Sequence, residues 1–448
     1  MKKTLHPLVT GTLLLTGAGL ITRLAGFFYK IFLSRAIGAE GIGIYQMIFP
    51  ISGVCYALTT SGAEISISRF VSRENGAGRR RSAGQVLILG LGLALGLSVP
   101  TALLLYTQAP VLALRLLREA RTVRLLQIMA LSLPFGACHS CISAYYYGCK
   151  RPGIPAAAQL LEQFSRVGAV LLIWRVACAQ GRSLTPLTAV AGLTLGEVAS
   201  MLFCVFSVSG EYGKRPAAVP GSPSLFSLGR QMFFLALPVT GNRLCMNLLA
   251  SAESILLPLC LQQYGLSAGQ ALSVYGTLSG MALSFILFPS VLTGALSVML
   301  LPSVSEAQAA GEDALLRRTI RKTISFCLPL GIFFTVFFLL TGRFLGSFFF
   351  RSDLAGGFIL TLAWICPFLY LNHTLHSILN GLGRTGTGFF NNLTGILIRI
   401  FFVLAFVPKV GIEGYLWGLL ASQLAVCGMN LTDLREYLQN PYKNLRDF

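Results

Sequence analysis

The feature that most constrains the folding of this chain is a succession of apolar segments, each long enough to cross a lipid bilayer. A hydrocarbon core about 30 Å thick requires roughly 20 apolar residues per helix. The composition agrees, because 54% of the 448 residues are hydrophobic and only 11% are charged, whereas a soluble domain has about 25% charged residues. We therefore expect an all-α, polytopic membrane protein, and soluble enzymes are excluded.

Hydropathy predicts about twelve transmembrane helices. They are expected near residues 8–34, 43–70, 83–107, 123–148, 154–178, 186–209, 229–262, 271–301, 319–341, 355–381, 387–408 and 412–437. The first of them follows Lys2 and Lys3 and has the outline of a secretory signal peptide. Its apolar stretch resumes after Arg23 and reaches Phe32, so we expect it to be retained as a membrane helix.

The distribution of cations over alternate loops predicts that both termini are cytoplasmic. Lys and Arg total 35 against 16 Asp and Glu, and the cluster from Arg115 to Arg124 is the main exception to the predicted sidedness. In a membrane protein, this excess favours anionic lipid headgroups or an anionic substrate as partners, and it gives no reason to expect nucleic acid.

An internal repeat predicts two lobes of six helices each. Gly148-Cys149-Lys150-Arg151 has a counterpart in Gly381-Leu382-Gly383-Arg384, 233 residues later. The lobes are expected at 1–210 and 230–448, joined by a cytoplasmic linker at 211–229 that is rich in Pro, Gly and Ser. With an even number of spans in each lobe, the lobes are expected to be pseudo-symmetric about an axis along the membrane normal, with a central cavity between them.

Ionisable and amide side chains inside the predicted spans are the candidates for function, since each charge in lipid costs a few kcal/mol unless it meets water or a partner. The candidate substrate-binding cations are Arg23, Lys30, Arg166, Arg243 and Arg399. The candidate coupling or structural groups are Glu64, Glu162, Asn242, Glu253, Asn391, Asn392 and Thr394.

The position of each cation on its helix leaves some alternatives open. Arg23 and Lys30 are seven residues apart and share one helix face, although either can also snorkel toward a helix end. Arg166 can pair with Glu162 one turn away, so structural pairing and substrate binding both remain possible for it. Arg399 has no acid one turn away, so we expect it to face a cavity.

No metal site, catalytic site or bound cofactor is expected. Cys138-His139-Ser140-Cys141 and the pair His373 and His376 have metal-like spacing, but such spacing in apolar helices usually arises by chance. We find no nucleophile-base arrangement and no GxxxxGK[ST] loop for nucleotide hydrolysis. A gradient of Na⁺ or H⁺ could supply the energy, with Asn242, Glu253, Asn391, Asn392 and Thr394 as candidate oxygen ligands.

Several motifs resemble one transporter superfamily. Thr22-Arg23-Leu24-Ala25-Gly26-Phe27 resembles the first-helix signature of the MurJ and stage V sporulation protein B groups within the multidrug/oligosaccharidyl-lipid/polysaccharide (MOP) exporter superfamily. Leu300-Leu301-Pro302-Ser303-Val304-Ser305-Glu306 is similar to the end of the eighth helix in the same groups, and Gly148 to Arg151 fits the fourth-helix exit. Tyr45-Gln46 and Glu162-Gln163-x-x-Arg166 favour the sporulation protein B group.

The resemblance spans both lobes and implies a flippase or exporter of the plasma membrane. We expect the protein to be a monomer. It would move an undecaprenyl-pyrophosphate-linked saccharide, such as a peptidoglycan precursor, between leaflets by alternating access. Arg23 corresponds to the first-helix arginine that faces the cavity. Tyr56, Ala57 and Ser284 stand where MurJ has further cavity arginines, and two C-terminal helices of MurJ have no counterpart before Phe448. The identity of the saccharide therefore stays open.

Three other interpretations fit parts of the pattern. A major facilitator transporter also has two sets of six helices, but the loop from Ser72 to Arg81 lacks the Asp of that family's loop motif. A cation-coupled drug antiporter of the same superfamily would favour acidic rather than basic cavity helices. A membrane scaffold without transport would not need buried cations on aligned helix faces.

Overall fold

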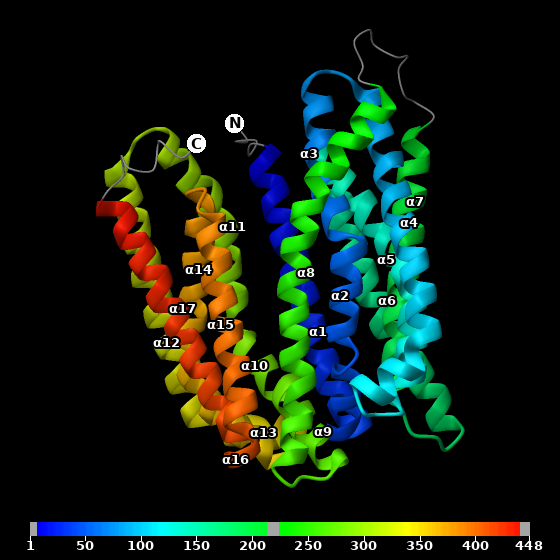
Figure 1. Cartoon of the computed structure of the whole chain (residues 1–448), viewed down its shortest axis with the longest axis vertical. Helices are drawn as coiled ribbons and strands as arrows, with labels where there is room; N and C mark the ends of the chain where they lie inside the picture. Colours follow the sequence, from blue (N-terminus) through cyan, green and yellow to red (C-terminus); the bar gives the residue numbers. More distant parts are fainter. Residues whose placement is uncertain (1–6, 213–223, 440–448) are drawn as a thin grey trace, which may run out of the picture. The chain divides into compact units, whose positions relative to one another are not determined.

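The computed structural model describes residues 7–212 and 224–439. The predicted cytoplasmic termini and the middle of the predicted 211–229 linker lie outside these residues, so their sidedness and role remain predictions. The described part of the chain is built of helices and contains no strand (Figure 1). The expected all-α class is confirmed.

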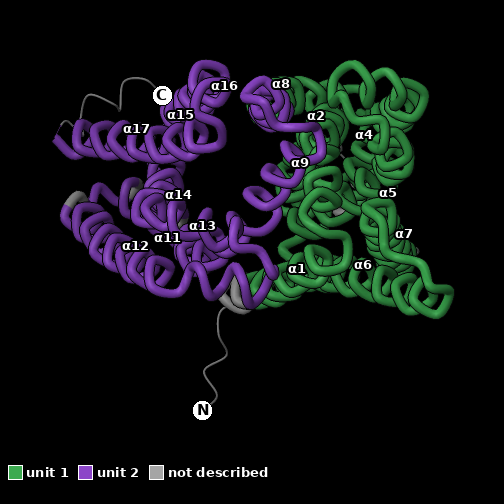
Figure 2. The backbone as a smooth tube through the Cα atoms, turned by 90° about the horizontal axis from the view of Figure 1, so that it is seen from below, with its two compact units in different colours: residues 1–251 green, residues 252–448 purple. Residues whose placement is uncertain are grey.

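The chain divides into two compact units, residues 1–251 and residues 252–448 (Figure 2). The division falls inside a single helix, α8 (Leu225–Gln263), just after Ser251. This division does not test the predicted lobe boundaries at 210 and 230, which remain predictions.

Unit 1 consists of long helices connected by short turns. Its elements are α1 (Pro7–Gln46), α2 (Phe49–Thr59), α3 (Ser61–Gly76), α4 (Arg80–Val111), the π-helix η1 (Leu112–Leu116), α5 (Thr122–Gly148), α6 (Gly153–Ala179), α7 (Pro186–Tyr212) and the first part of α8. Helix α1 has a non-helical residue at Gly38, where φ is 73° and ψ is 176°. A positive φ is readily adopted by glycine, so Gly38 allows the chain to kink before it enters α2.

Unit 2 has more interruptions. After the end of α8 it contains α9 (Ala268–Gly276), the π-helix η2 (Thr277–Ala282), α10 (Leu283–Leu287), α11 (Ser290–Ala309), α12 (Asp313–Phe350), α13 (Asp353–Leu362), the 3₁₀-helix η3 (Ala363–Ile365), α14 (Cys366–Gly381), α15 (Thr385–Ala405), α16 (Val407–Val410) and α17 (Ile412–Gln439). The expected single span at 271–301 is broken before Pro289, because proline has no backbone N–H to continue the helix.

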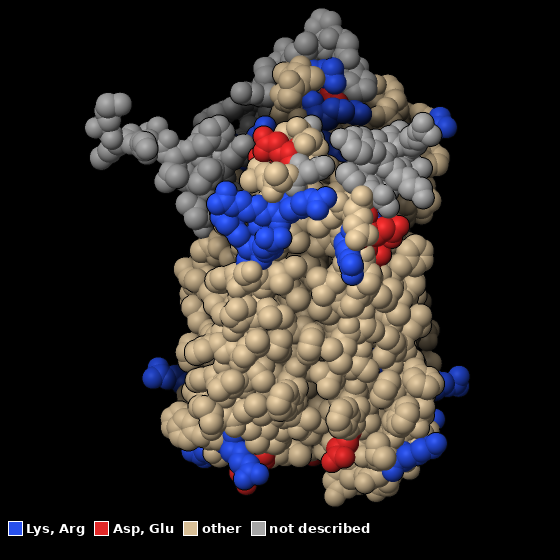
Figure 3. Space-filling view, turned by 90° about the vertical axis from the view of Figure 1, so that its left-hand side faces the viewer, with Lys and Arg blue, Asp and Glu red and all other residues tan. Residues whose placement is uncertain are grey.

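The helices have the length and apolarity of membrane spans. Ten helices within the described residues meet both criteria, and the pair Leu14–Gln46 and Phe49–Gly76, bent by 44°, meets them together. Side chains such as Phe206 and Leu340 are 79% and 81% exposed, which suits contact with lipid. On the face shown in Figure 3, charged side chains lie near the two ends and an uncharged band separates them. A polytopic membrane protein is confirmed, while the number twelve remains a prediction.

The predicted repeat is visible where two equivalent helices cross. A Cβ atom added to Gly148 would lie 2.7 Å from both the carbonyl oxygen of Ser68 and Cβ of Val71. At the equivalent crossing in unit 2, a Cβ atom on Gly381 would lie 2.9 Å from the carbonyl oxygen of Leu301 and 3.1 Å from a carbon of Val304. The three pairs of positions are each 233 apart in the sequence. Glycine is thus required in both units for the same close approach of backbones.

Candidate functional site

Unit 1 contains a hydrogen-bonded acid at the junction of three helices. The hydroxyl of Tyr56, on α2, donates to Oε1 of Glu64, on α3, at 2.6 Å. The same hydroxyl lies 3.2 Å from Oγ of Ser140, on α5. Glu64, predicted as a coupling or structural group, therefore has a polar partner within the unit.

A second group of side chains joins three further helices of unit 1. Nδ1 of His139, on α5, lies 3.3 Å from Oε2 of Glu197, on α7. Glu162, on α6, completes the group, because one ligand atom from each of the three residues lies within 4.8 Å of the others. We call His139, Glu162 and Glu197 the triad.

Two members of the triad, His139 and Glu162, line a cavity of about 420 Å³ together with Glu64 and Ser140. Glu162 pairs with the guanidinium of Arg166. Among the described side chains named here, carboxyl groups therefore outnumber guanidinium groups three to one. Such an excess inside a membrane protein calls for protons or a bound cation.

The triad is the one group of three or more potential metal ligands among the described residues. Its imidazole nitrogen and carboxylate oxygens are donors that divalent cations accept. Cys138 and Cys141 of the metal-like sequence motif do not belong to the triad. Sγ of Cys141 lies 4.0 Å from the carbonyl oxygen of Gly90. The second motif does not form such a group either, since His373 contacts Ser297.

Arg166 forms the ion pair that its spacing allows. Its Nη2 donates to Oε1 of Glu162 one turn earlier on α6. Both side chains are largely buried, at 20% and 18% exposure. The structural alternative for this pair is therefore realised, and a substrate-binding role for Arg166 stays a prediction.

In unit 2, Arg399 is also paired, although no acid lies one turn away from it on its own helix; its predicted position facing a cavity stays a prediction. Its Nε donates to Oε1 of Glu253 at 2.7 Å, and its Nη1 lies 3.2 Å from Oγ of Ser422. The hydroxyl of Tyr415 donates to the same carboxylate oxygen at 2.8 Å. The sequence argument considered only acids one turn away on α15, whereas Glu253 comes from α8 and Ser422 from α17.

The remaining candidate oxygen ligands are not gathered around Glu253. Nδ2 of Asn391 donates to Oδ1 of Asn430 at 2.9 Å and to Oδ2 of Asp433 at 2.7 Å. Asn391 precedes Arg399 by eight residues on α15, which corresponds to about 12 Å along the helix axis. The other predicted ligands have local contacts or are exposed: Asn392 lies against His376, Thr394 donates to the carbonyl of Phe390, and Asn242 is exposed on the unit 1 part of α8.

Two of the predicted cations have no acid partner within the part of the chain that the structure describes. Arg23 on α1 and Arg243 on α8 are exposed, and their side chains have no hydrogen bond or ion pair with the residues that the structure describes. Both lie within membrane-length segments, Leu14–Gln46 and Leu225–Gln263. Lys30 is an exposed residue of α1 seven positions after Arg23, which is about 10 Å along the helix.

Sequence reasoning overlooked three residues of these networks. Glu197 carried a usable signal, because it is an isolated acid inside the apolar segment 186–209. Tyr415 and Ser422 carried none, since a tyrosine and a serine in a membrane helix are common and their role depends on which helices pack together.

A polytopic protein of two helical units, with buried ion pairs and unpaired cations in its membrane helices, has the architecture of a membrane transporter. Residues 8–308 match the family described as polysaccharide biosynthesis protein, and the chain belongs to that family. It is 29% identical over 430 residues to stage V sporulation protein B of Bacillus subtilis (strain 168), covering 95% of this chain and 82% of the relative. It is 22% identical over 431 residues to the lipid II flippase MurJ of the same organism, covering 91% and 78%.

Solved structures confirm the superfamily fold. A multidrug resistance MATE family transporter of the MOP superfamily, in an inward-facing conformation, matches with a TM-score of 0.75 at 16% identity, covering 94% of this chain and 96% of that one. Lipid II flippase MurJ in an inward closed conformation matches with a TM-score of 0.72 at 14% identity, covering 94% and 87%. The resemblance inferred from the sequence motifs is thus confirmed, and the related proteins are transporters and flippases rather than enzymes.

Proposed function

We propose that this protein is a flippase that moves an undecaprenyl-pyrophosphate-linked saccharide across the plasma membrane by alternating access. Membership in the polysaccharide biosynthesis family and similarity to a lipid II flippase support a lipid-linked saccharide as the cargo. The observation that carries the proposal is the presence of Arg23 and Arg243 in membrane-length helices without an acid partner among the described residues.

The chemistry of these arginines fits a pyrophosphate. A pyrophosphate diester carries about two negative charges, and a guanidinium binds phosphate oxygens through two parallel hydrogen bonds. Placing an unpaired cation in the membrane costs a few kcal/mol of free energy. A bound anionic substrate offsets this cost, which the protein without substrate already carries. In this proposal Arg23, Arg243 and Lys30 meet the pyrophosphate, whereas Arg166 and Arg399 serve first as partners of Glu162 and Glu253.

Transport uphill needs a source of energy, and we propose a coupling cation, H⁺ or Na⁺, at the triad. The excess of carboxyl groups over guanidinium groups around His139, Glu162, Glu197 and Glu64 supports this location. It replaces the oxygen-ligand site first considered near Glu253, whose carboxylate is already held by Arg399 and Tyr415.

We also propose the placement and partners of the protein. Both termini would be cytoplasmic, as the cation distribution predicts, and the cargo would move from the inner to the outer leaflet. The chain would act as a monomer, with anionic lipids around its charged ends.

A drug antiporter is the second candidate, and the acidic triad together with the MATE-like fold favours it. The two functions differ in the charge of the cargo. Cationic dyes would be carried by an antiporter, whereas the flippase carries a pyrophosphate.

The test is a flipping assay in liposomes of phosphatidylcholine that contain the purified protein. Three fluorescent lipids are compared: an undecaprenyl-pyrophosphate disaccharide, an undecaprenyl-monophosphate sugar and phosphatidylcholine itself. We expect a membrane-impermeant quencher to reveal rapid exchange of the pyrophosphate lipid alone. Equal exchange of all three lipids, or uptake of cationic dyes without lipid exchange, would refute the flippase.

A further inference from the structure

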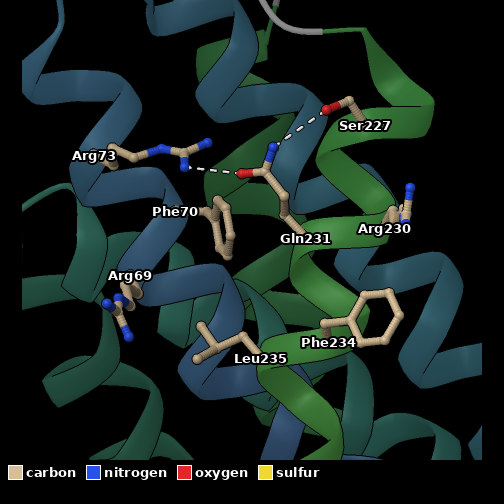
Figure 4. Close-up of a pocket in the computed structure, with 8 residues that line it drawn as sticks. All are labelled: Arg69, Phe70, Arg73, Ser227, Arg230, Gln231, Phe234 and Leu235. Carbon is tan, nitrogen blue, oxygen red and sulfur yellow. Dashed lines mark hydrogen bonds between the residues drawn. The ribbon is translucent and has the colours of Figure 1, made fainter.

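A groove rich in arginine lies at one end of unit 1, between the end of α3 and the start of α8. It has a volume of about 590 Å³, within the range of about 300–1,000 Å³ that is usual for ligand pockets. We call it the arginine groove, and it is lined by Arg69, Phe70, Arg73, Ser227, Arg230, Gln231, Phe234 and Leu235 (Figure 4). No acidic residue is among them.

The three guanidinium groups of the groove differ in how far they are already engaged. Arg69 has no hydrogen bond or ion pair with any described residue, and Arg230 has only an aromatic contact, 5.7 Å from the ring centre of Phe234. Arg73 donates to Oε1 of Gln231 at 3.0 Å (Figure 4) and to Oε1 of Glu74 at 3.1 Å. Most of the hydrogen-bonding capacity of Arg69 and Arg230 is therefore free.

The nearby carboxylate of Glu74 does not cancel this charge. Glu74 is fully buried and receives two hydrogen bonds from Arg79, at 2.7 Å and 3.2 Å. Since Arg79 already matches its single negative charge, the groove keeps an excess of about three positive charges. A ligand with one negative charge, such as the phosphodiester of phosphatidylglycerol, would leave most of this excess unmatched.

We expect the groove to lie near the depth of lipid headgroups, because it is close to one end of its helices. Arg69 is seven residues before the end of its membrane-length segment and Arg230 is five residues after the start of α8, which places both about 7–10 Å from a helix end. A headgroup layer extends about 5–8 Å beyond the hydrocarbon core. The positive-inside distribution predicts that this end of the helices is cytoplasmic.

Apolar side chains accompany the arginines. Phe234 is 60% exposed and Leu235 is partly buried, and both lie on α8 about two turns deeper than Ser227. A ligand held here would place a multiply charged head among the guanidinium groups and a hydrocarbon tail along Phe234 and Leu235.

We propose that the arginine groove is a docking site for the diphosphate headgroup of a polyprenyl lipid on the cytoplasmic side. The inference rests on the proposed function, because it names the place where the cargo is held before it is moved. A diphosphate offers two or more negative charges and several oxygens, and these match Arg69 and Arg230 as bidentate donors. Arg73, held by Gln231, is a third donor at the rim.

The test is direct binding of farnesyl pyrophosphate, a short and soluble probe, to the protein in phosphatidylcholine nanodiscs. The protein carries Arg23→Ala so that the proposed translocation path contributes little. We expect Arg69→Gln with Arg230→Gln to weaken binding at least about tenfold, since each removes a charge-assisted contact. The matched control is Arg318→Gln with Arg321→Gln, two exposed arginines at one end of α12 in unit 2, and it should bind like the parent.

Two further measurements separate the possible outcomes. Farnesyl monophosphate should bind more weakly than the pyrophosphate, and phosphatidylglycerol in the nanodisc should compete only slightly. Equal binding of both probes with full competition by phosphatidylglycerol would show a general anionic-lipid site and overturn the proposal. Unchanged affinity in the double variant, with its unfolding midpoint retained, would also overturn it. Because binding is measured without transport, such a failure leaves the flippase proposal untouched.

Discussion

Removing one partner of the ion pair between Glu253 and Arg399 should destabilise unit 2, because the other charge would be left buried and uncompensated. Arg399→Ala would leave the Glu253 carboxylate, 8% exposed in its side chain, with the hydroxyl of Tyr415 as its remaining partner. Breaking a buried pair costs about 3–5 kcal/mol, and the 19% exposure of the Arg399 side chain places the loss near the lower end, at about 3 kcal/mol.

This loss should be measurable as a shift in thermal unfolding in detergent. With an unfolding entropy of about 2.1 cal/mol/K per residue, unit 2 alone would convert about 3 kcal/mol into a lowering of about 7 °C. Adding Glu253→Gln removes the uncompensated charge, while the amide oxygen can still accept the hydrogen bond from Tyr415. We therefore expect the double variant to recover most of the loss.

The ion pair between Arg166 and Glu162 in unit 1 provides an internal comparison. Arg166→Ala leaves Glu162 beside the carboxylate of Glu197, so it should also lower the midpoint, and Glu162→Gln should restore it. Arg318→Ala, an exposed arginine of α12, is the control and should change little. An unchanged midpoint in Arg399→Ala, or a double variant less stable than either single variant, would refute the pairing argument.

Two other predictions concern titratable groups of unit 1. Arg121 donates to the Glu119 carboxylate through Nε at 2.8 Å and Nη2 at 2.9 Å. These hydrogen bonds lower the pKa of Glu119 below its ordinary value of 4.5. Glu119→Gln should therefore lower the free energy of unfolding by about 1 kcal/mol at pH 7, a value kept small because Arg121 is 53% exposed. The difference should be complete above pH 4.5 and vanish as the pH falls through the lowered pKa, so a pH-independent difference in unfolding midpoint would contradict it. Glu197→Gln should abolish the dependence of the flipping rate on an imposed H⁺ or Na⁺ gradient. Glu306→Gln, at an exposed acid of α11, is the control and should keep this dependence. If Glu197→Gln also keeps it, the triad is not the coupling site.

The fold could be predicted largely from the sequence because its signals are local. The length of each apolar segment indicates a membrane helix directly. The repeat of Gly148 in Gly381 predicted two related lobes, and the structure shows that both glycines lie at equivalent helix crossings. The interruption of the predicted helix 271–301 could also be predicted from the sequence, since Pro289 lies inside it. Its division into α9, η2, α10 and α11 could not be predicted, because π-helical turns depend on packing.

The candidate site was less predictable, because its contacts join residues from different helices. Arg166 and Glu162 lie on one helix, so their spacing in the sequence was enough to predict that they can pair. Arg399 and Glu253 are 146 residues apart, and no helical periodicity relates them. The triad likewise needed the packing of α5, α6 and α7, which the sequence alone does not supply.

The central claim is that an unpaired arginine in the membrane helices meets the pyrophosphate of the cargo. The most direct measurement is the rate at which Arg23→Ala flips the fluorescent undecaprenyl-pyrophosphate disaccharide in liposomes, beside Arg182→Ala, an exposed arginine outside the spans. Arg23 has no partner to lose within the described residues, so folding and insertion should be unaffected. We predict a loss of at least about tenfold in rate for Arg23→Ala, as expected for removing a charge-assisted contact to phosphate, and an unchanged rate for Arg182→Ala. Flipping by Arg23→Ala at the unmodified rate would contradict the account.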